Sequence, residues 1–151
     1  MISLKIEATV DTPCIVLDAG NNQFEISGKS YPEDTREFYA PVLAWMDLYV
    51  SSPNAETLFV FKLRYFNSST YKPIYDILTK LNTIKTGKVM VAWYYKDGDN
   101  DMLEAGEEFA ELKQKYGDER KTKIVKGALK EIGEEELVPE EDALFVLTHG
   151  G

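Results

Sequence analysis

Two apolar runs separated by a helical pattern constrain the fold of this chain more than any other feature. Residues 57–66, TLFVFKLRYF, and residues 88–95, KVMVAWYY, are rich in the β-branched and aromatic residues that favour strands. Between them, apolar residues recur at helical spacing from Tyr71 to Lys85, and Gly87 stands where helices commonly end. A strand, a helix and a strand in succession form a right-handed crossover, which makes the two strands parallel. The apolar residues on both faces of 57–66 predict a central strand covered on each side.

Strand patterns also precede this unit. Residues 2–10 alternate between apolar and polar side chains, as a half-buried strand does. Residues 14–19 and 23–28 flank the sequence GNN, whose residues tolerate positive φ, so we expect a β-hairpin there. Together with the parallel pair, the hairpin makes the expected sheet a mixed one.

Two further helices are expected to pack on this sheet. One lies within residues 30–52, where Pro41 should kink the helix or split off its first turn. The other follows Asp101, which we expect to be the N-cap because Glu104 three residues later completes a capping-box pattern. The expected fold class is therefore α/β, as a single domain.

The domain should occupy residues 1–116 of the 151-residue chain. Residues 117–151 form a C-terminal extension whose pattern is weaker. Within it, apolar residues at helical spacing predict a helix over 118–133, and ALFVLT predicts a last strand over 143–148.

Composition excludes several classes of function. The single cysteine, Cys14, leaves no internal disulfide and is expected in the core. The single histidine, His149, makes histidine-based catalysis or zinc binding improbable, so we expect no enzyme activity, cofactor or metal. A net charge of −9 disfavours nucleic acid and anionic membrane surfaces. With neither a signal peptide nor an apolar run long enough to span a membrane, the expected location is cytoplasmic.

Two local patterns suggest alternative functions. In DGDND, Asp97, Asp99 and Asp101 occupy positions 1, 3 and 5 of a calcium-loop pattern, but position 6 is Met102 instead of the required glycine. The terminal Gly150 and Gly151 match the tail that ubiquitin-like modifiers and sulfur carriers present. A calcium-binding module and a Gly-Gly modifier therefore stand as alternatives to the function argued below.

The stretch YFNSSTYKP, residues 65–73, carries more hydroxyl groups than a strand-to-helix corner needs. One of Asn67, Ser68, Ser69 and Thr70 is expected to cap the helix that follows. The others stand at the C-terminal end of a central strand, where α/β sheets commonly place their working loops. Free N–H groups at a helix N-terminus can donate hydrogen bonds to a phosphate. The corner is therefore well placed to be a phosphorylation site and a switch at an interface.

The sequence resembles the SiaC family across about residues 2–112. The matching segments are EATVDTP, FEISGKSYPEDTREFYAPVLAWMDLY, KLRYFNSSTYKPIYDIL and WYYKDGDNDMLEAGEEF. The family is similar in fold to STAS domains, the anti-sigma-factor antagonists. The resemblance implies a non-enzymatic partner switch, phosphorylated by a histidine-kinase-like Ser/Thr kinase and dephosphorylated by a PPM-type phosphatase. The unmodified form is expected to bind and activate a GGDEF diguanylate cyclase, which raises cyclic di-GMP and promotes aggregation or biofilm.

The family motif places the phosphoacceptor at Ser68, directly after Asn67, with Ser69 as the second candidate. The partner is expected to dock on the corner and on the neighbouring SYPE loop. The expected partner-binding residues are Tyr31, Pro32, Glu33, Tyr65, Asn67, Thr70, Tyr71 and Lys72. The extension 117–151 has no counterpart that the resemblance places.

Overall fold

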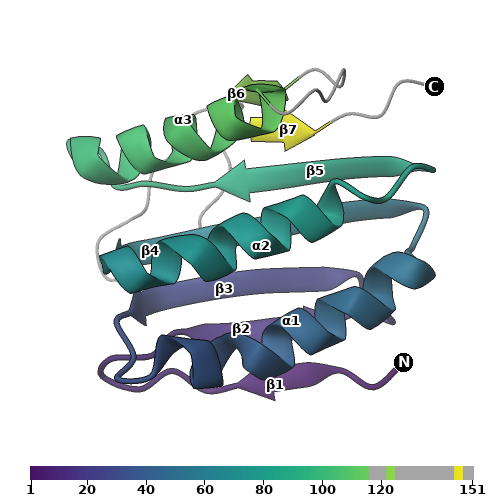
Figure 1. Cartoon of the computed structure of the whole chain (residues 1–151), viewed down its shortest axis with the longest axis horizontal. Coiled ribbons are helices and arrows are strands. Elements are labelled where there is room, and N and C mark those ends of the chain that lie inside the picture. Colours follow the sequence, from purple (N-terminus) through teal and green to yellow (C-terminus); the bar gives the residue numbers. More distant parts are fainter. Residues whose placement is uncertain (116–121, 125–144, 148–151) are drawn as a thin grey trace.

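A computed structural model describes residues 1–115, 122–124 and 145–147 (Figure 1). The strands among these residues form one seven-stranded sheet, with the order β1-β2-β3-β4-β5-β7-β6. The pairs β3–β4 and β4–β5 are parallel and the other pairs are antiparallel, so the predicted mixed sheet and the parallel crossover are confirmed. The strands are β1 Leu4–Ile6, β2 Cys14–Asp18, β3 Gln23–Ser30, β4 Glu56–Phe66, β5 Lys88–Trp93, β6 Thr122–Ile124 and β7 Phe145–Leu147.

In the described part of the chain, three α-helices accompany the sheet: α1 Thr35–Ser51, α2 Tyr71–Leu81 and α3 Asn100–Lys115. A short 3-10 turn, Ser68–Thr70, leads directly into α2. Helices α1 and α2 lie side by side across one face of the sheet, and α3 lies beside β5 (Figure 1). Among the described residues, no helix is long and apolar enough to cross a membrane.

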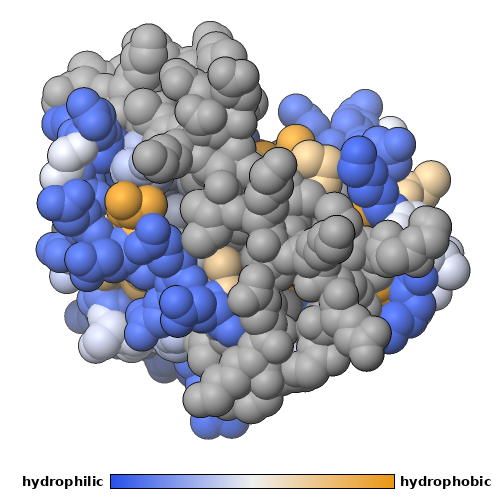
Figure 2. All heavy atoms as spheres, turned by 90° about the horizontal axis from the view of Figure 1, so that it is seen from above, coloured by the Kyte–Doolittle hydropathy of each residue, from blue (hydrophilic) through white to orange (hydrophobic). Residues whose placement is uncertain are grey.

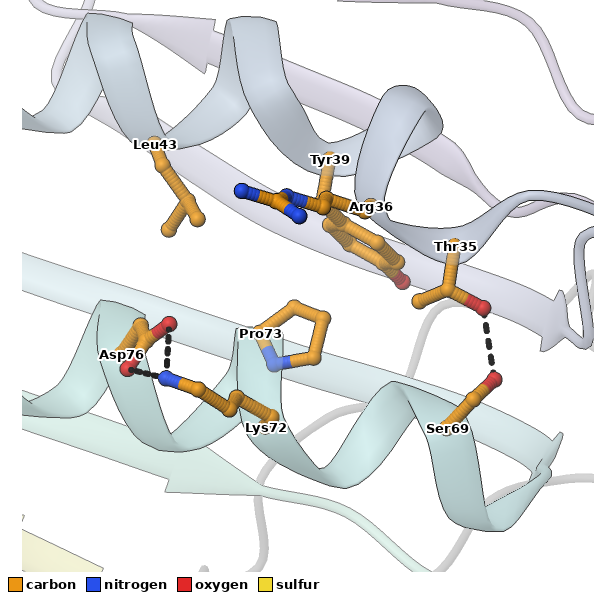
Figure 3. Close-up of a pocket in the computed structure, with 8 residues that line it drawn as sticks. All are labelled: Thr35, Arg36, Tyr39, Leu43, Ser69, Lys72, Pro73 and Asp76. Atoms are coloured by element: carbon orange, nitrogen blue, oxygen red, sulfur yellow. Dashed lines mark hydrogen bonds and ion pairs between the residues drawn. The ribbon is translucent and has the colours of Figure 1, made fainter.

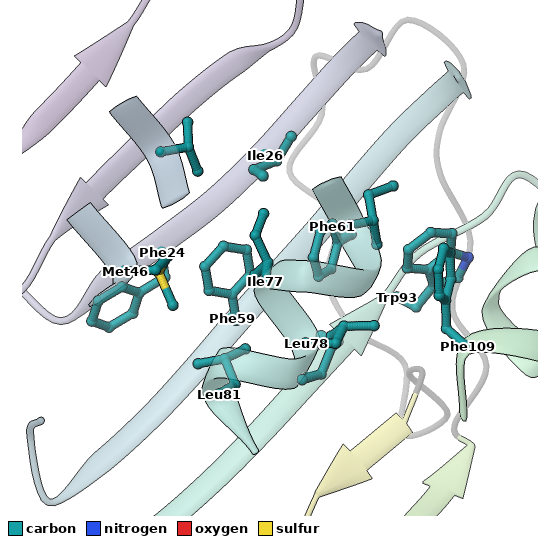
Figure 4. Close-up of a cluster of buried hydrophobic side chains, with 14 of the residues drawn as sticks. Phe24, Ile26, Met46, Phe59, Phe61, Ile77, Leu78, Leu81, Trp93 and Phe109 are labelled. Carbon is teal, nitrogen blue, oxygen red and sulfur yellow. The ribbon is translucent and has the colours of Figure 1, made fainter. Parts of the chain in front are cut away.

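The core lies between the sheet and the helices, and α3 contributes Met102, Phe109 and Ala110 to it. Alternate strand residues point into it, such as Phe24 and Ile26 from β3 and Phe59 and Phe61 from β4, and all four are at most 2% exposed (Figure 4). Burying each such side chain contributes about 1.5–3 kcal/mol to folding. The helices supply residues at a spacing of three or four, including Met46, Ile77, Leu78 and Leu81.

The other face of β4 is more open than the sequence predicts. Leu58 is 42% exposed, so the expectation that β4 is covered on both faces is wrong. Lys62 lies on the same face of β4 and forms an ion pair with Glu25 (3.6 Å). A charged pair of this kind favours contact with water, so this face is not packed as a second core. Cys14 also lies half-buried, outside the core formed by its neighbours Ile15 and Leu17, so its predicted core position is wrong.

The β-hairpin of β2 and β3 is confirmed, and Asn22 takes the positive φ (54°) that its turn requires. Helix α1 runs unbroken through Pro41, so no first turn is split off. Helix α2 ends at Leu81, four residues before the predicted Lys85. Gly87, with φ of 82°, instead lies in the loop before β5, where a Cβ would overlap the Ala55 carbonyl oxygen.

The N-cap of α3 is Asp99 and not the predicted Asp101. The Asp99 carboxylate accepts the Met102 N–H (3.1 Å), and its carbonyl accepts the Leu103 N–H (3.2 Å). A helix was predicted over residues 118–133. This prediction is wrong for residues 122–124, which form strand β6 and pair with β7. The rest of the predicted helix lies outside the described residues. The last strand is confirmed as β7.

Helix α3 approaches β5 closely at Gly106. The indole N–H of Trp93 donates to the Met102 carbonyl (2.9 Å), and the Trp93 ring is 1% exposed. A Cβ at position 106 would lie 2.7 Å from the indole nitrogen and would overlap the ring. Because the ring is buried and hydrogen-bonded, it has little room to move away.

We therefore expect Gly106→Ala to lower the free energy of unfolding by about 1–3 kcal/mol through overpacking. Thermal unfolding measures this, at roughly 2–4 °C per kcal/mol for a chain of this size. Gly20→Ala is the matched control, because its Cβ would make only an ordinary 3.7 Å contact. Equal melting temperatures for the two variants would contradict the close approach of α3 to Trp93.

Candidate functional site

The candidate site is the corner between β4 and α2, which lies at the same edge of the sheet as the end of β3 and the start of α1. Ser30, the last residue of β3, pairs with Phe66, the last residue of β4. The Asn67 N–H donates to the Ser30 carbonyl (3.0 Å) and so extends this parallel pairing by one residue. The turn Ser68–Thr70 follows at once, so the corner is fixed to the sheet from its first residue.

A chain of buried hydroxyl groups joins this corner to β3 and α1. The Ser30 hydroxyl lies 2.7 Å from the Tyr39 hydroxyl and 2.9 Å from that of Thr70. The Thr70 hydroxyl also lies within reach of the Asn67 side-chain oxygen (3.1 Å) and the Ser30 carbonyl (3.2 Å). If Tyr39 donates to Ser30 and Ser30 donates to Thr70, the Thr70 proton can go to the Asn67 side-chain oxygen or the Ser30 carbonyl. Every hydroxyl proton of this network then has an acceptor.

This network is almost fully removed from water. Ser30 and Thr70 are 0% exposed and Tyr39 is 1% exposed. Burial raises the pKa of the Tyr39 hydroxyl to about 12, against the opposing effect of its Ser30 hydrogen bond. Tyr39 therefore keeps its proton and remains a hydrogen-bond donor at neutral pH.

Ser69 is held by a second set of bonds at the surface. Its hydroxyl donates to the Asn67 side-chain oxygen (2.9 Å), and the Thr35 hydroxyl lies 2.6 Å from it (Figure 3). Since the Ser69 proton is directed at Asn67, Thr35 is the donor in the second bond. Ser69 thus connects the first residue of α1 to the turn before α2.

Ser68 differs from its neighbours. It is exposed, and its side chain has no hydrogen-bond partner among the residues that the structure describes. Neither Asn67 nor Thr70 caps a backbone N–H of the turn or of α2 with its side chain. The predicted side-chain cap is therefore wrong, because the 3-10 turn begins the helix and these side chains bond to one another and to Ser30.

Two predicted partner-binding tyrosines form an exposed aromatic pair. The rings of Tyr31 and Tyr65 meet edge to face, with centroids 5.8 Å apart. They are 37% and 51% exposed, so both rings are accessible to a partner. On the face that Figure 2 shows, the coloured atoms are mostly hydrophilic, with a few hydrophobic groups among them. Tyr65 immediately precedes Phe66 at the end of β4, so the pair lies next to the corner.

The other predicted residues have different surroundings. Tyr71 stacks on Phe109 of α3 (4.5 Å between centroids), and burial together with the Glu108 carboxylate raises its pKa. Glu33 is exposed, whereas Pro32 is buried. The expectation that Pro32 and Thr70 contact a partner directly does not fit their burial, and we assign both to the support of the corner. Lys72 is exposed and forms an ion pair with Asp76 (3.0 Å).

Three residues of this site were not expected from sequence: Ser30, Thr35 and Tyr39. The strand pattern could have indicated Ser30, because period-two alternation places it on the same buried face as Phe24 and Ile26. A polar side chain on that face needs a buried hydrogen-bond partner. Among the described residues, no three His, Cys, Asp or Glu side chains are grouped to hold a metal. The Gly-Gly terminus lies outside the described residues.

Comparison with known proteins identifies relatives of most of the chain. The model of the SiaC family, described as regulatory phosphoproteins, matches residues 6–116. An uncharacterized protein of Pseudomonas aeruginosa strain UCBPP-PA14 is 30% identical over 113 residues, which cover 74% of this chain and 90% of the relative. The family match stops one residue after the end of α3 at Lys115, so the extension 117–151 lies outside it.

Solved structures show the same fold. The crystal structure of apo-SiaC from P. aeruginosa is similar with a TM-score of 0.67 and 29% identity, over 74% of this chain and 93% of that one. The structure of the diguanylate cyclase SiaD in complex with its activator SiaC, from the same organism, is similar with a TM-score of 0.66 and 29% identity, over 72% and 90% of the two chains.

The hydroxyl network should contribute measurably to stability. We expect Thr70→Val to lower the free energy of unfolding by about 1–3 kcal/mol, because the buried Ser30 hydroxyl loses its acceptor. Denaturant unfolding measures this effect. Thr79→Val is the matched control, since Thr79 is exposed and its hydroxyl donates to the Tyr75 carbonyl (2.9 Å), and its effect should stay within about 0.5 kcal/mol. Equal effects of the two substitutions would argue against the network.

Proposed function

Because the chain belongs to the SiaC family of regulatory phosphoproteins, we propose that it is a partner switch whose unphosphorylated form binds and activates a GGDEF diguanylate cyclase. The SiaC of the solved complex is named as the activator of the cyclase SiaD, which supports a partner of this class. The protein acts by binding and not by catalysis. Its effect is to raise cyclic di-GMP in the cytoplasm and so to promote aggregation or biofilm.

The observation that carries this proposal is the difference between Ser68 and the hydroxyls beside it. Phosphorylation needs a hydroxyl that can enter the active site of a kinase. Thr70 is buried, and the Ser69 hydroxyl is bonded to both Asn67 and Thr35. Ser68 is exposed and unbonded within the described part of the chain, so it is the phosphoacceptor in our proposal, as the motif indicates.

A phosphate at Ser68 is compatible with the fold. Ser68 begins the turn that continues into α2, and the N-terminal end of a helix favours negative charge. The modification adds about −1.5 to −2 charges at neutral pH, on a chain whose net charge is already −9. The effect therefore falls on a docked partner and not on the stability of the domain.

The docking surface in this proposal combines the corner with the exposed pair Tyr31 and Tyr65. Rigid aromatic side chains supply large contact area at low entropic cost, and they are frequent binding hot spots. A histidine-kinase-like Ser/Thr kinase and a PPM-type phosphatase complete the switch, by adding and removing the phosphate at Ser68. Both enzymes need access to this residue, which its exposure permits.

The test is binding to, and activation of, purified GGDEF diguanylate cyclases of the host, with SiaD of P. aeruginosa as a reference. We expect the wild-type chain and Ser68→Ala to bind and stimulate one of them. A chain with phosphoserine incorporated at position 68 should bind at least tenfold more weakly. Ser3→Asp is the charge control, because Ser3 is exposed in the N-terminal segment before β1.

Two outcomes would count against the proposal. In one, no cyclase is bound or stimulated by the wild-type chain. In the other, the phosphoserine chain binds as tightly as the unmodified chain, which would mean that position 68 does not control docking.

A further inference from the structure

A groove of about 460 Å³ lies between α1 and α2 (Figure 3). Its walls are mostly carbon, from the side chains of Tyr39 and Leu43 on α1 and Pro73 on α2. One end is bounded by the Thr35–Ser69 hydrogen bond (2.6 Å). Further along the same two helices, Lys80 forms an ion pair with Asp47 (2.6 Å), which holds α1 and α2 together. We call this feature the α1–α2 groove.

One cation on the rim of the groove forms no ion pair with any residue that the structure describes. This cation is Arg36, which is exposed and lines the groove. The other cation of the rim, Lys72, is already paired with Asp76 (3.0 Å). An unpaired guanidinium beside an apolar wall suits a ligand that carries both a carboxylate and aliphatic groups, since arginine binds carboxylates with two parallel hydrogen bonds.

The groove is continuous with the proposed switch. Ser69 both bounds the groove and directly follows Ser68 in the same turn. A partner seated in the groove would therefore reach the corner, and a phosphate at position 68 would stand next to it. The walls are helices whose backbone groups are already bonded within each helix, so they offer no strand edge to pair with. An amphipathic helix satisfies its own backbone groups, so it can lie against these walls without pairing to them.

We propose that the α1–α2 groove receives a short amphipathic helix of the cyclase, with aliphatic side chains against the half-buried Leu43 and a carboxylate on Arg36. This inference rests on the proposed function and adds the chemistry of the partner to it. Phosphorylation of Ser68 then has a direct effect on this contact. The phosphate repels the carboxylate of the partner helix and competes with it for the positive charge of Arg36.

The experiment compares two pairs of variants in binding to the cyclase that the wild-type chain stimulates. Leu43→Asp changes the groove, and Leu48→Asp places the same charge at an α1 position that is 66% exposed and does not line the groove. Arg36→Glu reverses the rim charge, and Lys85→Glu makes the same reversal at an exposed residue after α2. We expect the dissociation constant to rise at least tenfold for Leu43→Asp and Arg36→Glu and less than twofold for the two controls.

Thermal unfolding of each variant separates binding from folding. Arg36 lies in the first turn of α1, where a glutamate favours the helix dipole, so Arg36→Glu should keep the wild-type melting temperature. If Leu43→Asp fails to fold, the comparison of Arg36→Glu with Lys85→Glu is sufficient to test the groove. Unchanged affinity for Arg36→Glu, with binding still lost on phosphorylation of Ser68, would overturn the groove and leave the partner switch standing. Absence of any cyclase binding by the wild-type chain would overturn both.

Discussion

The structure of the corner depends on one buried polar interaction, the hydroxyl chain from Tyr39 through Ser30 to Thr70. Three protein segments meet in it: the end of β3, the second turn of α1 and the start of α2. An unsatisfied hydroxyl in such a place costs about 1–3 kcal/mol, so each member keeps the other two in position. The corner is thus rigid on its inner side, and the sheet, α1 and the turn before α2 behave as one unit.

The hydroxyl residues of the corner have two different roles, structural support and exposure to solvent. Thr70 faces inward and is fully buried, and Ser69 is bonded to Asn67 and Thr35 at the surface. Ser68 is the remaining hydroxyl, and it faces solvent at the N-terminal end of the helical segment. In the proposed switch, a fixed support and a free hydroxyl are both required, because a phosphate on a flexible loop would not alter a docking surface in a defined way.

Period-two and period-3.6 patterns were sufficient to predict the elements from β1 to α3 and the parallel crossover, because burial of one face sets those patterns. They failed where a local contact decides the outcome. Asp99 and not Asp101 caps α3, and α2 ends at Leu81, since the choice of cap depends on packing that spacing does not record. In the site, the burial of Thr70 and Pro32 could not be read from their residue types. The likeness to STAS domains, drawn from the family resemblance, stays a prediction.

The central claim is that geometry leaves Ser68 as the phosphoacceptor of this corner. Site-resolved mass spectrometry of the chain purified from its own host, with phosphatases inhibited during lysis, tests this claim most directly. The account predicts phosphate on Ser68, with Ser69 and Thr70 unmodified. Phosphate on Ser69 or Thr70 in molecules whose Ser68 is unmodified would contradict it, because the hydrogen bonds that hold those two hydroxyls would then not protect them.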